Sequence, residues 1–259
     1  MSQQGEVQEA GVQAAQLAGR GFFVTLEGID RSGKTTQVER LCASLAARGL
    51  PVGVAGVPGG SLREPGGTPA GEAIRDVLLH RPNEIAPWTE ALLYAAARAQ
   101  LVSELLRPSL EAGLIVVLDR YVDSSLAYQG FARGLGIDAV LEVNQRATGG
   151  LLPDLTLLLR VDPDRAARRA GGPPARLEAE GRALQARVAA GYDELARRYP
   201  ERIVALDGER PAAAVAADVE RATLAALDAL TAAPAPVAPG SSASPPAASP
   251  TARSGHGVR

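Results

Sequence analysis

The sequence predicts an α/β fold in which a five-stranded parallel sheet is flanked by helices on both faces. Strand-like and helix-like segments alternate along most of the chain. Two of the strand segments, 113–118 and 155–161, are largely apolar throughout, which is typical of strands buried on both faces of a parallel sheet. Parallel neighbours need crossover connections, and the intervening helices supply them.

Residues 28–35 form a glycine-rich loop, Gly-Ile-Asp-Arg-Ser-Gly-Lys-Thr. The loop fits G-x-x-x-x-G-K-[ST], in which backbone N–H groups surround phosphate oxygens. A strand pattern at 21–27 precedes the loop, and a helical pattern at 37–45 follows it. This order aims the N-terminus of a helix at the bound anion. The segment therefore predicts a nucleoside triphosphate site on a three-layer P-loop NTPase fold.

Lys34 is the only lysine of the chain. Its ammonium is a compact charge that can follow the β- and γ-phosphates, and a planar guanidinium does not replace it. The alternative interpretation is a glycine-rich turn that binds no ligand, and it leaves the position of this single lysine unexplained.

The elements around the loop follow from local patterns. Residues 1–20 are rich in Gln, Ala and Gly and are expected to form a disordered extension. Residues 51–57 are a second strand candidate, and 58–67 are expected to be a loop. Thr68 can cap the helix that follows it. A longer helix is expected over about 87–106.

The second half of the chain continues the alternation. Further helices are expected at about 123–131, 137–147, 176–199 and 210–229, with a fifth strand at 202–206. Asp162 and Pro163 can open a short helix after the strand at 155–161. One domain is therefore expected over 21–230. Residues 231–259, rich in Pro, Ala and Ser, are expected to be a disordered tail.

Composition restricts the partners and the compartment. The formal net charge is −2, so no global basic field predicts binding to nucleic acid. Cys42 is the single cysteine, which excludes an internal disulfide framework. No apolar run approaches the ~18 residues that a membrane span needs, and the N-terminus lacks a signal-peptide pattern. We therefore expect a cytoplasmic protein that does not bind membranes.

Other motifs separate the classes that share this loop. Signalling GTPases read the base with Asn-Lys-x-Asp, which is impossible here because Lys34 is the only lysine. Transport ATPases carry Leu-Ser-Gly-Gly-Gln, which is also missing. A small kinase remains, with a second pocket for an acceptor and a lid.

From about Phe22 to Leu206 the sequence resembles the thymidylate kinase family of the nucleoside-monophosphate kinase superfamily. The resemblance rests on the loop and on the segments 63–68, 74–75, 90–98, 119–121, 124–130 and 153–156. It implies transfer of a phosphoryl group from ATP·Mg²⁺ to dTMP, which gives dTDP for dTTP synthesis, and it implies a homodimer.

The motif and the resemblance assign roles around ATP. Lys34 is expected to bridge the β- and γ-phosphate oxygens, and the Thr35 hydroxyl to ligate Mg²⁺. Asp119, which ends a buried strand beside the loop, is expected to reach Mg²⁺ indirectly, for example through a coordinated water; the alternative is an aspartate that only caps the next segment. Arg31 resembles a loop arginine that meets the transferring phosphoryl group in one branch of the family. The expected ATP-binding residues are Gly28, Ile29, Asp30, Arg31, Ser32, Gly33, Lys34, Thr35 and Thr36.

The resemblance also places the acceptor. Arg63, Arg75 and Arg120 are implied ligands of its phosphate, and guanidinium forks suit that group. With Lys34 and Arg31, Arg120 completes the expected catalytic set. The base and sugar ligands implied by the family are Tyr94 stacking on thymine, Arg98, Ser125 and Gln129 at the base edge, Tyr128 against the deoxyribose, and Asp30 at the 3′-OH.

Two departures from the family pattern stand out. The segment 49–63 is longer than usual. The lid around Arg168, Arg169 and 171–176 is short, and Ala175 replaces its usual Asp. Two rival interpretations remain open: another nucleoside or nucleotide kinase, and a catalytically silent nucleotide-binding regulator.

Overall fold

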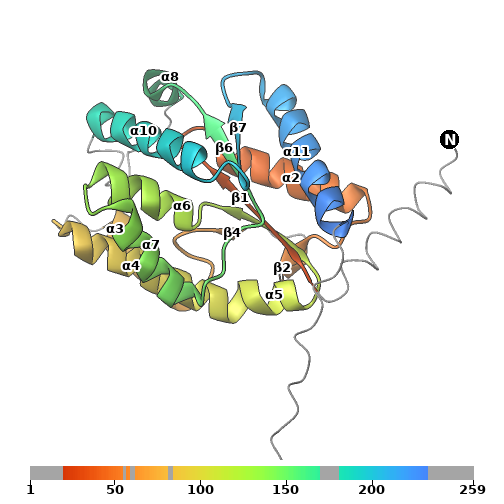
Figure 1. The fold of residues 1–259 in the computed structure, drawn as a ribbon, viewed down its shortest axis with the longest axis horizontal. Coiled ribbons are helices and arrows are strands. Elements are labelled where there is room, and N and C mark those ends of the chain that lie inside the picture. The colour runs from red at the N-terminus through yellow and green to blue at the C-terminus, as the bar shows by residue number, and fades with distance from the viewer. Residues whose placement is uncertain (1–19, 55–56, 59–61, 81–83, 170–180, 233–259) are drawn as a thin grey trace, which may run out of the picture.

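The structure is a computed structural model, which describes residues 20–54, 57–58, 62–80, 84–169 and 181–232. Its centre is a sheet of five parallel strands in the order β4-β5-β1-β6-β7 (Figure 1). The strands are β1 Phe22–Glu27, β4 Leu62–Arg63, β5 Ile115–Asp119, β6 Leu155–Arg160 and β7 Ile203–Asp207. The predicted fold class is confirmed.

The register of the sheet determines where a ligand can bind. β1 lies at the centre, with β5 on one side and β6 on the other. Leu26 of β1 pairs with Asp119 of β5, so both strands end at the same edge of the sheet. In open α/β sheets, ligands bind in the crevice outside the carboxyl ends of the strands. The glycine-rich loop leaves β1 at this edge.

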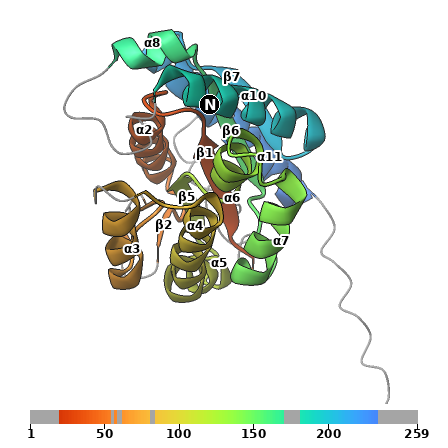
Figure 2. The same cartoon turned by 90° about the vertical axis from the view of Figure 1, so that its left-hand side faces the viewer.

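Helices cover both faces of the sheet because its central strands are apolar on both sides. Phe22 packs into one core with α2 (Lys34–Ala47) and α11 (Ala212–Ala232). The next residue, Phe23, packs into the opposite core with α4 (Pro87–Leu101), α7 (Ile137–Thr148) and α10 (Arg182–Arg198). Figure 2 views the molecule from the side of α4, α7 and α10. The result is the three-layer arrangement expected from the sequence.

The remaining elements connect these layers. They are α3 Pro69–Leu79, the π-helical turn η1 Val102–Leu106, α5 Arg107–Glu111, α6 Val122–Ser125, the π-helical turn η2 Leu126–Ala132 and α8 Pro163–Arg168. The expected caps are confirmed, since the side chains of Thr68 and Asp162 accept hydrogen bonds from the first turns of α3 and α8. Cys42 is buried in the core, and burial raises its pKa to about 11.

The second strand candidate, 51–57, is only partly confirmed. Val52 forms a single parallel bridge with Ile115 of β5, whereas β2 (Gly53–Val54) pairs with β3 (Val57–Pro58) in a small antiparallel ribbon outside the main sheet. The edge position of the main sheet belongs instead to β4, inside the segment expected to be a loop. A two-residue edge strand flanked by glycines has no periodicity by which a pattern could reveal it.

Some expectations lie outside the described residues. They are the disordered extension up to residue 19, the tail from 233 onward, and the part of the lid at 170–180. In the part of the chain that the structure describes, every helix is too short or too polar to span a bilayer.

Candidate functional site

The side chain of Lys34 folds back onto the glycine-rich loop and forms hydrogen bonds with it. Nζ of Lys34 donates hydrogen bonds to the carbonyl oxygens of Gly28 (3.2 Å) and Ile29 (2.8 Å). Ser32 Oγ lies 3.3 Å from the same nitrogen. Burial, followed by the nearby charge of Arg120, lowers the pKa of Lys34 to about 8. An anion in the loop would relieve the penalty that burial imposes on the ammonium.

Arg31 and Arg120 have positive φ angles, 64° and 70°. Among the described residues they are the only non-glycine residues with this left-handed backbone. Such strain costs of the order of 1–3 kcal/mol and gathers at ligand sites. Arg31 lines a hollow of about 110 Å³ between the loop, α8 and the start of α10. Both strained residues are arginines that the sequence assigned to phosphate.

Thr35 and Asp119 meet at the loop. Thr35 Oγ1 donates a 2.6 Å hydrogen bond to Oδ2 of Asp119, while Oδ1 of that carboxylate is buried with no hydrogen-bond partner. A hydroxyl and a spare carboxylate oxygen fit Mg²⁺, which uses few protein ligands and completes its shell with phosphate and water. The described residues hold no cluster of three or more His, Cys, Asp or Glu side chains that could bind a metal by themselves.

A cavity of about 160 Å³ opens beside the loop. Segments that are distant in sequence supply its walls, namely the loop, the residues after β4, α3, α4 and the α6–η2 segment. Seven predicted acceptor residues line it: Asp30, Arg75, Tyr94, Arg120, Ser125, Tyr128 and Gln129. The structure therefore brings most of the proposed dTMP ligands together.

Arg120 connects this cavity to the loop. Its Nη1 donates a 3.0 Å hydrogen bond to the carbonyl oxygen of Gly28, and its Nη2 lies 2.5 Å from Oδ1 of Asp30. The guanidinium carbon lies 5.4 Å from the centre of the Tyr128 ring. Burial opposes ionisation of Asp30, but the charges of Arg120 and Lys34 outweigh it and lower the pKa of that carboxyl. At this end of the loop, the negative charge of Asp30 thus lies beside the positive charges of Arg120 and Lys34.

Arg75 lies in the opposite wall of the cavity, and Arg63 is near enough to act on it electrostatically. Arg75 Nη1 donates a 2.8 Å hydrogen bond to the carbonyl oxygen of Pro65. Burial and then the neighbouring charge of Arg63 lower the pKa of Arg75. Arg63 itself is exposed in β4 and does not line the cavity. The positive charge of both side chains favours a bound anion at this wall.

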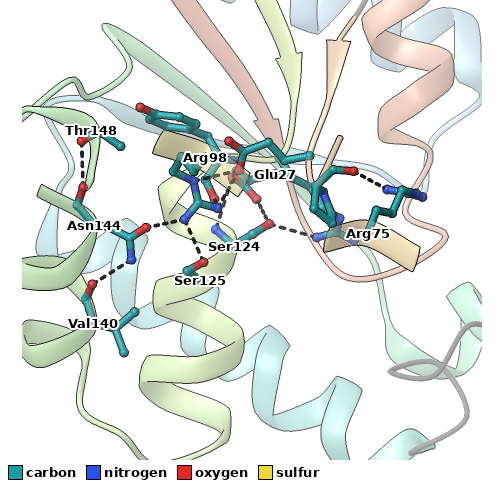
Figure 3. A network of polar contacts seen from close by, with 12 residues as sticks. Glu27, Arg75, Arg98, Ser124, Ser125, Val140, Asn144 and Thr148 are labelled. Atoms are coloured by element: carbon teal, nitrogen blue, oxygen red, sulfur yellow. Dashed lines mark hydrogen bonds and ion pairs between the residues drawn. The ribbon is translucent and has the colours of Figure 1, made fainter. Parts of the chain in front are cut away.

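Arg98 is buried and does not line the cavity; Figure 3 shows it at the centre of a network of polar contacts. Its guanidinium makes an ion pair of 2.6 Å with Glu64, donates a 3.0 Å hydrogen bond to Ser125 Oγ, and also contacts Asn144 and the carbonyl oxygen of Tyr121. Burial raises the pKa of Glu64 to about 7, against the effect of Arg98. Arg98 therefore does not line the cavity itself but donates a hydrogen bond to Ser125, which does.

Glu27, Ser124 and Tyr192 were assigned no role from the sequence, although they form a hydrogen-bonded group around Arg120. Glu27 ends β1 fully buried, and burial, followed by the charge of Asp123, raises its pKa. Its Oε2 accepts hydrogen bonds from Ser124 Oγ (2.6 Å) and the Tyr192 hydroxyl (2.8 Å). Arg120 Nη1 donates to the same two hydroxyls. The sequence signal that could have identified Glu27 is that an acidic residue ends the apolar strand before the loop.

A second hollow, of about 260 Å³, lies on the other side of the loop. Its lining includes Ser32, Gly33 and Thr36 of the predicted ATP set. Arg169 spans it, because Nη1 donates to the Ser32 carbonyl oxygen at 3.2 Å and Nη2 to that of Gly208 at 3.0 Å. The loop thus contributes to the walls of both this second hollow and the 160 Å³ cavity.

Comparisons of the sequence with known proteins find one family. A family model described as thymidylate kinase matches residues 26–219. A thymidylate kinase of Thermoanaerobacter sp. (strain X514) is 48% identical over 190 residues, or 73% of this chain and 90% of the relative. A thymidylate kinase of Deinococcus radiodurans is 50% identical over 196 residues, or 74% of this chain and 91% of the relative.

Proposed function

Since the chain belongs to the thymidylate kinase family, we propose that the cavity lined by Arg120 and the second hollow, lined by Arg169, hold the two substrates of that reaction end to end across the glycine-rich loop. The protein phosphorylates dTMP to dTDP with ATP. The observation that carries the proposed placement is the cavity beside the loop, whose lining includes Arg75 and Arg120 as well as Tyr94. Residues 21–230 form the catalytic domain in this proposal.

The acceptor phosphate lies between Arg75 and Arg120. A phosphate monoester has a second pKa near 6 and is already nucleophilic at pH 7, so the transfer needs no general base. Catalysis is then positioning and charge stabilisation. Arg63, close enough to lower the pKa of Arg75, adds to the positive field at the phosphate. Arg120 contacts both Asp30 and the loop carbonyl of Gly28. It therefore positions the acceptor phosphate relative to the transferring phosphoryl group of ATP.

The nucleoside of dTMP occupies the remainder of the cavity. Tyr94 stacks on the base, and Ser125 with Gln129 meets its edge. Arg98 acts on the base edge through Ser125, to which it donates a hydrogen bond. Tyr128 lies against the deoxyribose, and Asp30 accepts from the 3′-OH.

ATP occupies the loop and the second hollow. Its phosphates bind the backbone of 28–36 and the ammonium of Lys34, and its adenine lies against Arg169, which spans that hollow. Arg31 stabilises the charge that develops on the transferring phosphoryl group, as an arginine finger does. The positive charge of Arg31 in the loop takes the place of a catalytic charge that the short lid would otherwise supply.

Mg²⁺ accompanies the ATP phosphates. Thr35 and Asp119 hold it, and the spare Oδ1 of Asp119 supports this assignment. When bound, the ion would neutralise part of the negative charge of the ATP phosphates.

The protein acts in the cytoplasm as a homodimer in this proposal. Among the described residues, Trp88 and Leu92 are large apolar side chains that remain 42% and 52% exposed, and they are four residues apart on α4. Such a face is suited to a second copy of the chain. Light scattering should give the mass of a dimer, and Leu92→Glu should shift it toward a monomer.

A coupled assay of ADP release tests the placement of the substrates. Lys34→Ala should abolish turnover, because it removes the charge at the ATP phosphates, whereas Arg75→Ala should raise the KM for dTMP. A protein that binds ATP tightly but releases no ADP with any nucleoside monophosphate would instead be the silent regulator. Another nucleotide kinase would show its highest turnover with a different monophosphate.

A further inference from the structure

Glu90 stands behind the cavity wall. It lies in the first turn of α4, is fully buried and does not line the cavity. Its Oε1 accepts a 2.9 Å hydrogen bond from Nε2 of Gln129, which does line the cavity. On its other side Nη2 of Arg133 lies 3.2 Å from Oε2. A carboxylate paired with an arginine therefore supports the Gln129 amide.

The chemistry of this contact fixes the orientation of the amide. An ionised carboxylate only accepts hydrogen bonds, whereas a glutamine amide has a donor NH₂ group at one end and an acceptor oxygen at the other. The reverse orientation would place two acceptors together in a buried site, which is costly. Gln129 must therefore turn its nitrogen toward Glu90. Its carbonyl oxygen is then the atom left to meet a ligand.

Ser125 is oriented in a similar way. Nη1 of Arg98 donates to its Oγ at 3.0 Å, and a guanidinium has no acceptor. The hydroxyl hydrogen of Ser125 must therefore be donated elsewhere. Ser125 and Gln129 line the same cavity, so it offers a donor beside an acceptor.

This pair complements one class of pyrimidine. Thymine and uracil present O4, an acceptor, next to the N3–H donor, whereas cytosine presents an amino donor next to an acceptor nitrogen. We propose that Glu90 is a positioning residue for base selection, which holds Gln129 so that the site accepts a 4-oxopyrimidine monophosphate and rejects a cytosine one. The inference rests on the proposed placement of the base beside Ser125 and Gln129.

Steady-state kinetics of Glu90→Gln with dTMP and dCMP test this role. The new amide can donate or accept, so Gln129 can invert at little cost. We expect the ratio of kcat/KM for dTMP over dCMP to fall by about tenfold or more, as for a mismatched bidentate contact. The change should come from a higher KM for dTMP and a lower KM for dCMP, with a smaller effect on kcat. An unchanged ratio would overturn the proposal.

Asp123→Asn is the matched control. Asp123 is equally buried and paired with Arg202, at 2.6 Å, but does not line the cavity. This variant should keep the dTMP-to-dCMP ratio even if its stability falls. An equal loss of selectivity in both variants would contradict a specific role for Glu90.

A ligand measurement on the wild-type protein does not depend on whether variants fold. By calorimetry, dTMP methylated at N3 should bind at least about tenfold more weakly than dTMP, because the methyl group replaces the N3–H from which the Gln129 oxygen accepts a hydrogen bond. Equal binding of the two ligands would overturn the proposal. Wild-type protein that fails to phosphorylate dTMP would instead refute the proposed placement of the substrates, so the two failures are distinguishable.

Discussion

The hydroxyl of Tyr192 lies 3.3 Å from Nη1 of Arg120. Tyr192 belongs to α10, whereas Arg120 follows β5 and faces the acceptor cavity. The same hydroxyl donates to Glu27 at the end of β1. One side chain of α10 therefore contacts both the strand that carries the loop and the arginine that we assign to the acceptor phosphate.

Tyr192→Phe should raise the KM for dTMP by about tenfold, because a hydrogen bond to a charged group contributes roughly 1.5–3 kcal/mol. The KM for ATP should change little. The ring and its edge-to-face contact with Tyr128, 6.5 Å between centroids, would remain. Tyr199→Phe, which alters a tyrosine that does not line the cavity, is the control. Equal changes in both substrate KM values would show that Tyr192 is only structural.

Lys34 gives ATP binding a pH dependence. Its pKa of about 8 lies below the ordinary 10.5, so in the protein without ATP this ammonium loses its proton as pH rises through 8. ATP needs the charged form, and its affinity should fall above pH 8, approaching tenfold per pH unit. Between pH 8 and 10.5 the unfolded chain binds more protons at this site, so its contribution to stability rises with pH there. Calorimetry from pH 7 to 9 measures the affinity, with Lys34→Ala as control; a flat wild-type profile would contradict the assignment.

Arg31→Ala should lower kcat by about 10³ or more, as the loss of an arginine finger does in other phosphoryl-transfer systems. ATP binding should weaken far less, because the backbone of the loop and Lys34 still hold the phosphates. Single-turnover rates and equilibrium ATP titrations measure the two effects separately. Equal losses in rate and affinity would remove the finger assignment.

Tyr94→Ala should raise the KM for dTMP by about tenfold, because stacking of a base on an aromatic ring contributes roughly 1–3 kcal/mol. Tyr94→Phe keeps the ring and should stay close to the wild type. Initial rates at saturating ATP measure both variants. If KM stays unchanged in the alanine variant, Tyr94 is a core residue rather than a base contact.

Local patterns predicted the parts of the site that are continuous in sequence. The glycine-rich loop, the Thr68 cap and the expected helical stretch that carries Ser125 and Gln129 each depend on a few neighbouring residues. The last pair lies where α6 passes into the π-helical turn η2, but the four-residue spacing still places both side chains on the cavity.

Long-range partners could not be predicted in the same way. Arg98 lies behind the wall because Glu64 and Asn144, which are 34 and 46 residues away, surround it. Tyr192 meets Glu27 across 165 residues. No local pattern determines such pairs, because they depend on how the layers pack.

The most direct test of two anionic substrates meeting at the loop is the rate of ADP release with ATP and each nucleoside monophosphate in turn. The account predicts the highest kcat/KM with dTMP, and loss of that turnover in Lys34→Ala. Turnover with dTMP no higher than with dCMP, dGMP and AMP would contradict it.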